Sequence, residues 1–578
     1  MAIVEQEQNL AINQVESSTC NDESTLVEVD EYFNLAKALC YVEGNGDQGT
    51  GFLYKLPKSS NPNLQFTKKE YGILTASHAL GFKHLTLNFN NGQIILHTNE
   101  GVNDEYFKTQ MKNIVKEVKL SVQILNKDQA INLKEFRFED IIDGSECIIG
   151  KKLDFALLPF KQEFKLENQE LLKNSLELKI DNFEERGKVI IIQFPQEIRV
   201  NRESKFNKEI GFSIGWLTGL IPLNCDEMSN KETETSLIPQ LLMHRVSTVH
   251  CSSGSPLINL ETKNGNQRLS VIALHFSGYM SSFNQNFAIP ICFILSEFRE
   301  LVIELNPELA ISFELSRFFL GKMTLRSPST ESCEAYNNIC YGGDSPIYSH
   351  QILSQVIYAM CTIQRNNQVV GSGFIGKFLR NNQEHFGLIT TVCEIKTINA
   401  DNNNMQIYSL RFKNGESVLL QDLVDEEKEK EIWMSTINCI PFKQEILIGS
   451  NKFRTVEIAI RLAAYMPIEN KQALILTTNF NGKLSLLTTI VKEVKESFNF
   501  QLEEDFLWSR HSFGGVILQM RDGDGAMQIA EAIGTIANSN TGNYINLYYA
   551  RNFSLEGSQQ MEEELKGIIS IECQHIYV

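Results

Sequence analysis

Positive charge is scarce in this sequence. Its 578 residues carry 53 Lys and Arg against 71 Asp and Glu, which gives a net charge of −18 at pH 7. A surface this acidic repels the phosphates of nucleic acids and anionic lipid headgroups. We therefore expect no nucleic acid and no membrane among the partners.

Long apolar runs and leader-like segments are missing as well. No stretch of about 18 consecutive apolar residues indicates a membrane-spanning helix. The first 25 residues are acidic and lack both the basic region and the apolar region of a secretory signal. We expect a protein that is not secreted and that works in the cytoplasm or the nucleus.

Dense cysteine patterns are also missing. The 12 cysteines are scattered along the chain, and the lack of a CxxC pair predicts reduced thiols instead of a disulfide framework. The nearest candidates for a metal site are His244, His250 and Cys251, and they lack a convincing fourth ligand. We expect no metal and no organic cofactor.

What the sequence does have is the balance of a folded protein with more than one core. Apolar residues make up 42% and charged residues 21%, and the chain exceeds the usual size of a single domain. Short runs that favour β structure are separated by Gly, Asn and charged residues. These runs are AKALCYV, GTGFLYKL, YGILTAS, HLTLNF, GQIILH, VIIIQF, FSIGWLTGLI and RLSVIALHF. The pattern predicts an all-β fold with a few short helices.

Domain boundaries follow from changes in composition. Residues 1–28 are polar and acidic, which predicts a disordered tail. The clearest helical periodicity lies near 292–305 and 308–322, and a Ser-, Asn- and Gly-rich linker follows. We predict one domain at 29–305, a helical segment and linker at 306–344, and a second domain at 345–578.

Three short motifs recur in the same order in both halves of the chain. The first half contains GTGF, GILT and FNNG after Cys40, and the second contains GSGF, GLIT and FKNG after Cys361. Three ordered matches with comparable gaps indicate a duplicated domain.

Three segments of the first half supply the groups for acyl transfer by a serine. That chemistry needs a hydroxyl nucleophile, an imidazole that takes and returns its proton, and a carboxylate that orients the imidazole. LTASH ends at His78, LDFALL contains Asp154, and SSGSP contains Ser253. These segments resemble those around the catalytic residues of trypsin-like serine peptidases, and their order is that of the chymotrypsin-like fold. Each residue alone is equally acceptable as a structural one, so the argument rests on all three together.

The resemblance covers residues 31–300 well and residues 345–578 more loosely. It implies two tandem chymotrypsin-like domains, each of two six-stranded β-barrels, with an insertion near 105–150 that decorates the cleft. It also implies an endopeptidase acting on protein or peptide substrates. In it Ser253 is the nucleophile, His78 is general base and then acid, and Asp154 orients His78.

The resemblance further implies that the backbone N–H groups of Cys251 and Ser253 form the oxyanion hole. The family almost always has glycine at the position of Cys251, and a misdirected donor costs roughly 3 kcal/mol of transition-state stabilisation. Two functions therefore stand side by side. One is an active serine endopeptidase, and the other is a weak or inactive tandem protein that binds or scaffolds partners.

Thr248 and His275 resemble the pair with which glutamyl endopeptidases and picornaviral 3C-type peptidases bind a substrate Glu or Gln. An imidazole beside a hydroxyl suits an acidic or amide side chain. Packing of His275 on a strand and the β propensity of Thr248 explain the two residues equally well. A preference for Glu or Gln at P1 is thus one of two open interpretations.

The second half lacks the catalytic groups at the matching positions. Cys393, Glu457 and Phe513 stand where the base, the acid and the nucleophile are expected. A thiol such as Cys393 is a nucleophile in principle, but a buried inert cysteine is commoner. We expect a degenerate domain that packs against the first, presents substrate or binds a partner protein.

Overall fold

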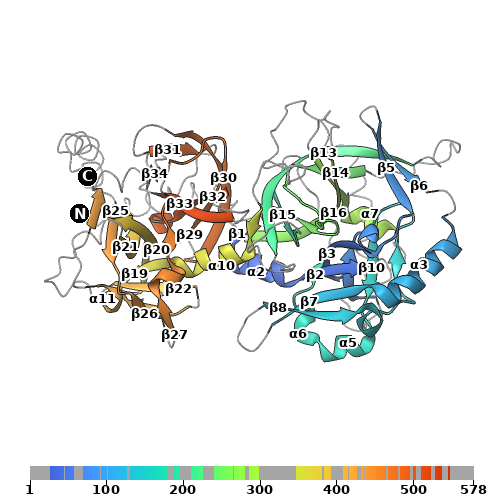
Figure 1. Cartoon of the computed structure of the whole chain (residues 1–578), viewed down its shortest axis with the longest axis horizontal. Helices are drawn as coiled ribbons and strands as arrows, with labels where there is room; N and C mark the ends of the chain where they lie inside the picture. The colour runs from blue at the N-terminus through green and yellow to red at the C-terminus, as the bar shows by residue number, and fades with distance from the viewer. Residues whose placement is uncertain are drawn as a thin grey trace, which may run out of the picture. The chain divides into compact units, whose positions relative to one another are not determined.

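The structure of the chain is a computed structural model (Figure 1). It describes residues 27–44, 46–56, 69–90, 93–99, 102–125, 131–178, 188–195, 210–225, 240–263, 266–279, 285–297, 347–380, 383–391, 408–413, 415–425, 431–434, 437–448, 451–463, 466–479, 482–494, 499–502, 510–522, 528–536 and 544–546.

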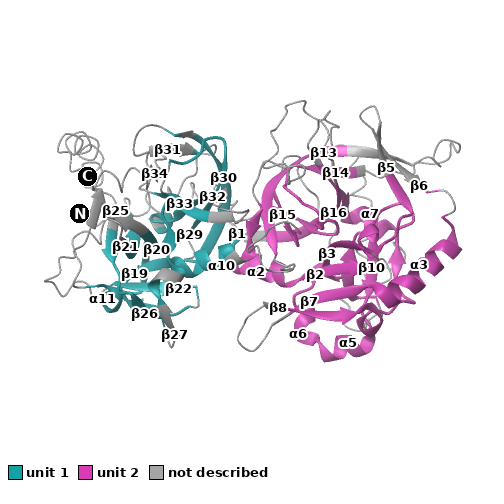
Figure 2. Cartoon of the chain, in the orientation of Figure 1, with its two compact units in different colours: residues 1–28, 352–521, 529–578 teal, residues 29–351, 522–528 magenta. Residues whose placement is uncertain are grey.

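The chain divides into two compact units (Figure 2). Unit 2 comprises residues 29–351 and 522–528, and unit 1 comprises residues 1–28, 352–521 and 529–578. Both units consist mostly of β-strands, as the sequence predicts. None of the described helices is long and apolar enough to cross a membrane.

Unit 2 contains an open sheet that carries the first half of the candidate site. Its strand order is β8-β7-β2-β3-β4-β10-β9, and β11 pairs with β3. The strands are β2 (Leu39–Gly44), β3 (Asp47–Lys55), β4 (Tyr71–Thr75), β7 (Lys119–Leu125), β8 (Ile131–Arg137), β9 (Ile148–Ile149), β10 (Ala156–Pro159) and β11 (Leu176–Glu177). The helices of this region are α2 (Val29–Lys37), η2 (Ser77–Leu80), α3 (Asp104–Glu117), α4 (Phe138–Ile141), α5 (Gln162–Glu167) and α6 (Gln169–Leu172).

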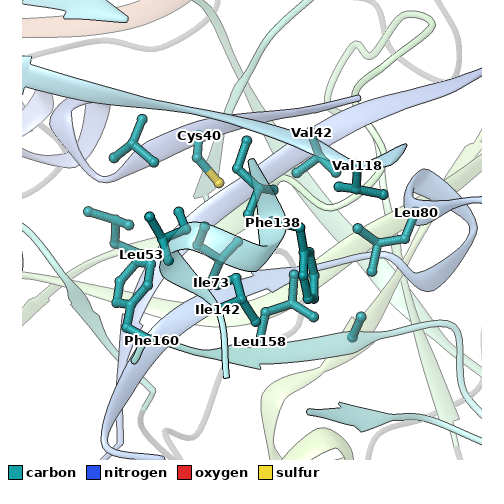
Figure 3. Close-up of a cluster of buried hydrophobic side chains, with 14 of the residues drawn as sticks. Cys40, Val42, Leu53, Ile73, Leu80, Val118, Phe138, Ile142, Leu158 and Phe160 are labelled. Atoms are coloured by element: carbon teal, nitrogen blue, oxygen red, sulfur yellow. The ribbon is translucent and has the colours of Figure 1, made fainter. Parts of the chain in front are cut away.

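The core of this sheet follows from alternation along its strands. Residues two apart in a strand point to the same face, so pairs such as Leu120 and Val122 enter the same buried cluster. Figure 3 shows Phe138 of α4 in this cluster, with Ile73 and Leu158 beside it.

The stretch near 105–150 corrects one prediction. It was expected to be an insertion that decorates a cleft, but β7 pairs with β2 and β8 extends the sheet. Helix α3 buries Ile114 in the same core, with Phe107 and Met111 packed against it. The stretch therefore belongs to the hydrophobic core of the open sheet.

The second sheet of unit 2 contains a closed ring of six strands. The order is β12-β15-β16-β17-β14-β13, and β12 also pairs with β13, which closes the ring. Strands β6 and β5 extend the sheet beyond β13, and β18 also pairs with β13. The bounds are β5 (Leu85–Asn90), β6 (Gln93–Thr98), β12 (Lys188–Gln193), β13 (Gly211–Cys225), β14 (Gln240–His244), β15 (Pro256–Lys263), β16 (Asn266–Tyr279), β17 (Gln285–Pro290), β18 (Tyr348–Ser349) and the following helix α7 (Ile291–Ser296).

Unit 1 contains an open sheet and a second closed ring. The open sheet has the order β23-β22-β19-β20-β21-β25-β24, with β28 beside β20. The other sheet has the order β1-β30-β29-β32-β33-β34-β31, and pairing of β30 with β31 closes a ring. The strands are β1 (Val27–Glu28), β19 (Met360–Arg365), β20 (Gln368–Arg380), β21 (Gln383–Thr390), β22 (Tyr408–Phe412), β23 (Ser417–Leu419), β24 (Glu431–Met434), β25 (Ile437–Pro441), β28 (Ile460–Arg461), β29 (Gln472–Thr478), β30 (Leu484–Val494), β31 (Asn499–Leu502), β32 (Val516–Asp522), β33 (Gln528–Ile536) and β34 (Tyr544–Asn546). The remaining elements are the hairpin β26 (Glu445–Ile448) and β27 (Asn451–Arg454) with the helices α10 (His350–Ala359), α11 (Leu420–Leu423), α12 (Thr455–Ile458) and η7 (Arg510–Ser512).

Several predicted elements lie partly or wholly outside the residues that the structure describes. The end of the predicted disordered tail, Val27–Glu28, forms strand β1, and residues 1–26 lie outside the described residues. Helix α7 covers the start of the helix predicted at 292–305, while the helix at 308–322 and most of the linker lie outside. The domain boundaries predicted at 305 and 344 stay predictions.

Candidate active site

Paired strands bring His78 and Asp154 together. Strands β4 and β10 pair with Thr75 opposite Ala156, so the residues after β4 and those before β10 lie at the same end of the sheet. The His78 Nδ1–H donates to Asp154 Oδ2, and the His78 backbone N–H donates to Oδ1 at 3.0 Å. The Ser77 hydroxyl also donates to Oδ1.

This network fixes the charges of the pair. Burial raises the pKa of Asp154, but the His78 charge and the hydrogen bonds from His78 and Ser77 lower it to about 2. Burial lowers the pKa of His78, but the charge and hydrogen bond of Asp154 outweigh it and hold the pKa above its usual value. The Asp154 side chain is 11% exposed, whereas the His78 side chain is 42% exposed. The carboxylate is therefore enclosed and part of the imidazole is open to a substrate.

A buried histidine supports the loop before Asp154. The His84 Nε2–H donates to Gly150 O at 2.8 Å, and the Gly150 N–H donates to Phe155 O at 2.9 Å. His84 is 1% exposed and packs edge-on against Phe107 of α3. These contacts tie the loop that leads to Asp154 to the aromatic side of the core.

Ser253 lies in a turn that packs against the residues around His78. A Cβ on Gly49 would lie 2.5 Å from Ala79 Cβ and 2.9 Å from Ser253 O. Only a residue without a side chain fits between these two segments. The Thr50 N–H donates to Ser253 O at 2.8 Å. The turn with Ser253 and the helix with His78 therefore both come close to Gly49, at the place where a side chain would lie.

The Ser253 hydroxyl does not bond to His78. It donates to Phe276 O at 3.1 Å. A register shift between His275 and Ser277 in the pairing of β16 with β17 leaves Phe276 in a bulge, which directs its carbonyl away from the ladder. The Ser253 backbone N–H has no acceptor among the described residues. It is available to a bound group.

Gly254 has a conformation that other residues rarely adopt. Its φ is +90°, and a Cβ at this position would lie 1.9 Å from Thr50 O. The Gly254 N–H donates to His275 O at 2.7 Å. A side chain at Gly254 would push Ser253 away from the sheet that positions it.

Cys251 shares this unusual backbone. Its φ is +73°, and the Ser252 N–H donates to Val249 O at 3.1 Å, so residues 249–252 form a turn. A positive φ at the third residue is typical of a type II turn, which favours glycine there. The Thr50 Oγ1–H donates to Cys251 O at 2.9 Å. A cysteine is thus held in a glycine conformation where the oxyanion hole was predicted.

A buried glutamine, Gln193, holds the rest of this loop through Ser252 and Ser247. The Ser252 hydroxyl donates to Gln193 Oε1 and accepts from the Val249 N–H at 3.0 Å. Gln193 Nε2 donates to Ser247 O at 3.0 Å. Ser252 is 1% exposed and Gln193 is fully buried. This neutral network positions the loop without a buried ion pair.

The two predicted specificity residues are both buried. Thr248 is 1% exposed and His275 is 2% exposed. The His275 ring packs edge-on against His244, with ring centroids 5.4 Å apart. Burial and the nearby His78 charge lower the pKa of His275 to about 3, despite a hydrogen bond with the Phe287 backbone. Its imidazole is therefore neutral at neutral pH, and its pairing with Thr248 stays a prediction.

Unit 1 contains a turn with similar contacts. The Ser372 N–H donates to Phe513 O at 2.7 Å, and Thr390 Oγ1 donates to Ser372 O at 2.8 Å. Gly514 has a φ of +85°, and a Cβ there would lie 1.9 Å from Ser372 O. In unit 2 the corresponding contacts join Thr50 N to Ser253 O at 2.8 Å and Thr75 Oγ1 to Thr50 O at 2.8 Å.

Strand pairing corrects the position assigned to Glu457. In unit 2 Ala156, two residues after Asp154, lies opposite Thr75. In unit 1 Asn438 lies opposite Thr390, the threonine that matches Thr75. The residue two before Asn438 is Thr436, whereas Glu457 belongs to α12. Glu457 is therefore not at the Asp154 position, and both Thr436 and Cys393 lie outside the described residues.

Sequence reasoning missed three residues that hold the site: Thr50, Ser77 and Gln193. The sequence does give a sign of the role of Gln193. It is a polar residue near the end of the apolar run VIIIQF, and a buried polar group needs a hydrogen-bond partner. The only sequence signal for Ser77 is its place next to His78. The sequence gives no sign of the role of Thr50, because Cys251, which accepts from its hydroxyl, lies about 200 residues away in the chain.

Comparisons with known proteins give distant structural matches. No family model matches the sequence, and no curated protein matches it. The chain is similar to the crystal structure of an inactive form of Rv3671c from M. tuberculosis H37Rv, with 12% identity, 48% of this chain and 90% of that chain covered, and a TM-score of 0.26. It is similar to Deg5, with 15% identity, 47% and 94% covered, and a TM-score of 0.24. It is also similar to the MamO protease domain from Magnetospirillum magneticum, with 12% identity, 46% and 98% covered, and a TM-score of 0.25. Similarity at this level says nothing of activity or substrate, and the roles of the residues rest on the geometry above.

Proposed function

We propose that unit 2 is a serine endopeptidase in which Ser253, His78 and Asp154 form the catalytic triad. The observation that carries this proposal is the hydrogen-bonded pair of an enclosed Asp154 carboxylate and a half-open His78 imidazole, next to the turn with Ser253. A buried carboxylate that fixes the tautomer of an accessible histidine is the arrangement that activates a serine.

The chemistry needs one rotation of the nucleophile. The Ser253 hydroxyl turns from Phe276 O to His78 Nε2 and attacks the scissile carbonyl as His78 takes its proton. Asp154 stabilises the imidazolium, and His78 then returns the proton to the leaving amine. The Ser253 and Cys251 N–H groups receive the oxyanion. Water repeats the sequence on the acyl-enzyme and releases the second product.

A peptide substrate suits the open edge of β16. Pairing of β15 with β16 reaches only to Leu274, and beyond it Ser277, Gly278 and Tyr279 pair with β17 alone. The opposite edge of this stretch has no strand partner among the described residues. An extended peptide can pair there in the manner of an added strand, which would bring its scissile bond next to Ser253.

A fluorophosphonate probe tests the proposal. We expect the full chain to be labelled at pH 8 on the peptide that contains Ser253, because only an activated serine attacks the probe at a useful rate. Intact mass and peptide mass spectrometry measure the adduct, and Ser255→Ala is a matched control that should still be labelled. An unlabelled wild-type protein between pH 6 and 9 would refute the triad and favour the rival function. In that case unit 2 is an inactive binding module, consistent with the bond from Ser253 Oγ to Phe276 O.

The neutral His275 gives a testable P1 preference. Because its pKa is about 3, the imidazole at pH 7 can donate an N–H to a Gln side chain but offers no charge to a Glu carboxylate. We expect kcat/KM at pH 7 to be about tenfold higher for a P1 Gln peptide than for its P1 Glu counterpart. The ratio should fall between pH 7 and 5, as the Glu side chain becomes protonated. A Glu preference at pH 7, or a preference for neither residue, would contradict this role of His275.

We also propose that unit 1 is a degenerate copy of unit 2. The common order of the two open sheets and the matched contacts of Thr50 and Ser372 support a duplication. Phe513 at the nucleophile position has no hydroxyl, so unit 1 is a pseudopeptidase domain that binds a partner protein or presents substrate. We propose a cytoplasmic or nuclear location, where the free thiols of the chain stay reduced.

A further inference from the structure

A cavity in unit 2 lies away from the candidate catalytic residues. It has a volume of about 510 Å³ and is lined by residues of β3, β4, α5 and α6, helices that Figure 1 shows beside each other at the lower edge of this unit. This volume is within the usual range for small-molecule sites, roughly 300–1,000 Å³. Tyr71, which lines the cavity, begins β4, whereas His78 follows the other end of that strand.

The charged side chains that line the cavity are all cationic. Lys55, Lys165 and Lys173 line it, and no Asp or Glu does so among the described residues. Lys55 makes no ion pair within the described part of the chain, and Lys173 pairs with the exposed Glu170 at 2.7 Å. Three lysines on one cavity are unusual in a chain with a net charge of −18.

Lys165 is the buried member of this set. It is 5% exposed, and burial lowers its pKa although the charges of Glu70 and Asp143 oppose the shift. An ammonium group in such a place is stabilised by each further negative charge that comes near it. The Ser175 hydroxyl, which also lines the cavity, is buried without a hydrogen-bond partner among the described residues. It can donate to a bound oxygen.

Another part of the lining is apolar. Leu166 is 63% exposed, and Leu172 and the Tyr71 ring line the cavity beside it. An exposed leucine next to a cavity is a surface that an apolar ligand group would cover. The cavity thus offers positive charge and apolar contact to the same occupant.

We propose that this cavity binds a small organic carboxylate, with its negative head group toward Lys55, Lys165 and Ser175 and its apolar body against Leu166 and Leu172. The occupant touches Tyr71 at the start of the strand that leads to His78, so the site is suited to an effector of unit 2. Binding itself does not depend on the proposed peptidase activity, and the two are tested separately.

The test uses the full chain and the probe 4-(trifluoromethyl)benzoate, observed by fluorine NMR. We expect a Kd of about 1 mM or tighter, the affinity typical of a ligand of this size. The neutral analogue 4-(trifluoromethyl)benzamide should bind at least fivefold more weakly, because it lacks the charge. Equal binding of acid and amide, or no binding of the acid at 10-fold this concentration, would overturn the proposal.

Variants locate the site. Lys55→Gln should weaken binding of the acid at least threefold and Lys165→Met at least tenfold, while binding of the amide stays unchanged. Lys119→Gln is the matched control, because Lys119 lies on β7 and pairs with Glu135 outside the cavity. If Lys165→Met lowers the melting temperature, the variant Lys55→Gln decides the question, because Lys55 is only partly buried. Unchanged binding by Lys55→Gln, or an equal loss in Lys119→Gln, would show that the acid binds elsewhere.

Discussion

Replacing Asp154 with asparagine should lower kcat/KM for peptide hydrolysis about 10⁴-fold at neutral pH, the size of effect that this change has in triad enzymes. The carboxylate accepts from His78 Nδ1, from the His78 backbone and from Ser77. An amide in this place has one oxygen to accept and an NH₂ group that must donate. It would turn the imidazole to the tautomer with a proton on Nε2, which cannot take the proton of Ser253.

The matched control for this variant is Asp143→Asn. Asp143 is also an aspartate of unit 2, but its carboxylate accepts from Ser145 at 2.6 Å and belongs to a turn. Steady-state hydrolysis and the rate of fluorophosphonate labelling measure both variants, with far-ultraviolet circular dichroism to verify folding. A loss of less than tenfold in Asp154→Asn, or an equal loss in Asp143→Asn, would contradict the role given to Asp154.

The same pair predicts how pH affects the protein. Because the pKa of Asp154 is lowered to about 2, its ionised form stabilises the fold above its unfolded pKa of about 3.9. This contribution is lost as the pH falls toward 2. Since the pKa of His78 is raised, the fraction of active, neutral imidazole falls on acidification at a higher pH than for a free histidine.

The three segments of the proposed triad could be recognised in the sequence because each pattern is local. A strand, a short turn and a histidine, or a Ser-Gly turn after a loop, leave patterns within a few residues. The runs around β3, β4 and β12 were recognised for the same reason. In the structure His78 and Asp154 form a hydrogen bond. The pairing of β4 with β10 brings them together although they are 76 residues apart in the chain.

The parts that the sequence could not predict depend on such pairing. Glu457 occurs in an apolar sequence like that of Asp154. The register of strand pairing, however, decides which residues of two strands lie opposite each other, and that register is set by contacts between segments far apart in the chain. Thr50 likewise looks like any strand threonine until its partner Cys251 is known. Helix α3 was missed although Phe107, Met111 and Ile114 follow a helical period, because the segment was interpreted as an insertion.

The backbone conformation of Cys251 leads to the second prediction, which concerns the rate of acylation. In a turn over residues 249–252, the peptide between His250 and Cys251 is the central one, and type I and type II turns differ by a flip of that peptide. The flip reverses the direction of the Cys251 N–H, which is a predicted oxyanion donor. The φ of +73° is the type II conformation, and for a residue with a Cβ it costs about 1–2 kcal/mol.

Cys251→Gly should therefore raise the rate of acylation by an order of magnitude, within a range of roughly 5- to 30-fold that corresponds to this cost. Glycine favours the turn that the structure already has, so a larger fraction of molecules holds the donor in place. Cys251→Ala is the matched control, because alanine keeps the Cβ and loses only the thiol that contacts Gln48 Oε1 at 3.5 Å. It should stay within twofold to threefold of the wild-type rate. Equal gains in both variants would mean that the thiol, and not the turn, limits the rate of acylation. No gain in Cys251→Gly would mean that the hydrogen bond from Thr50 to Cys251 O already holds the oxyanion hole in its active form.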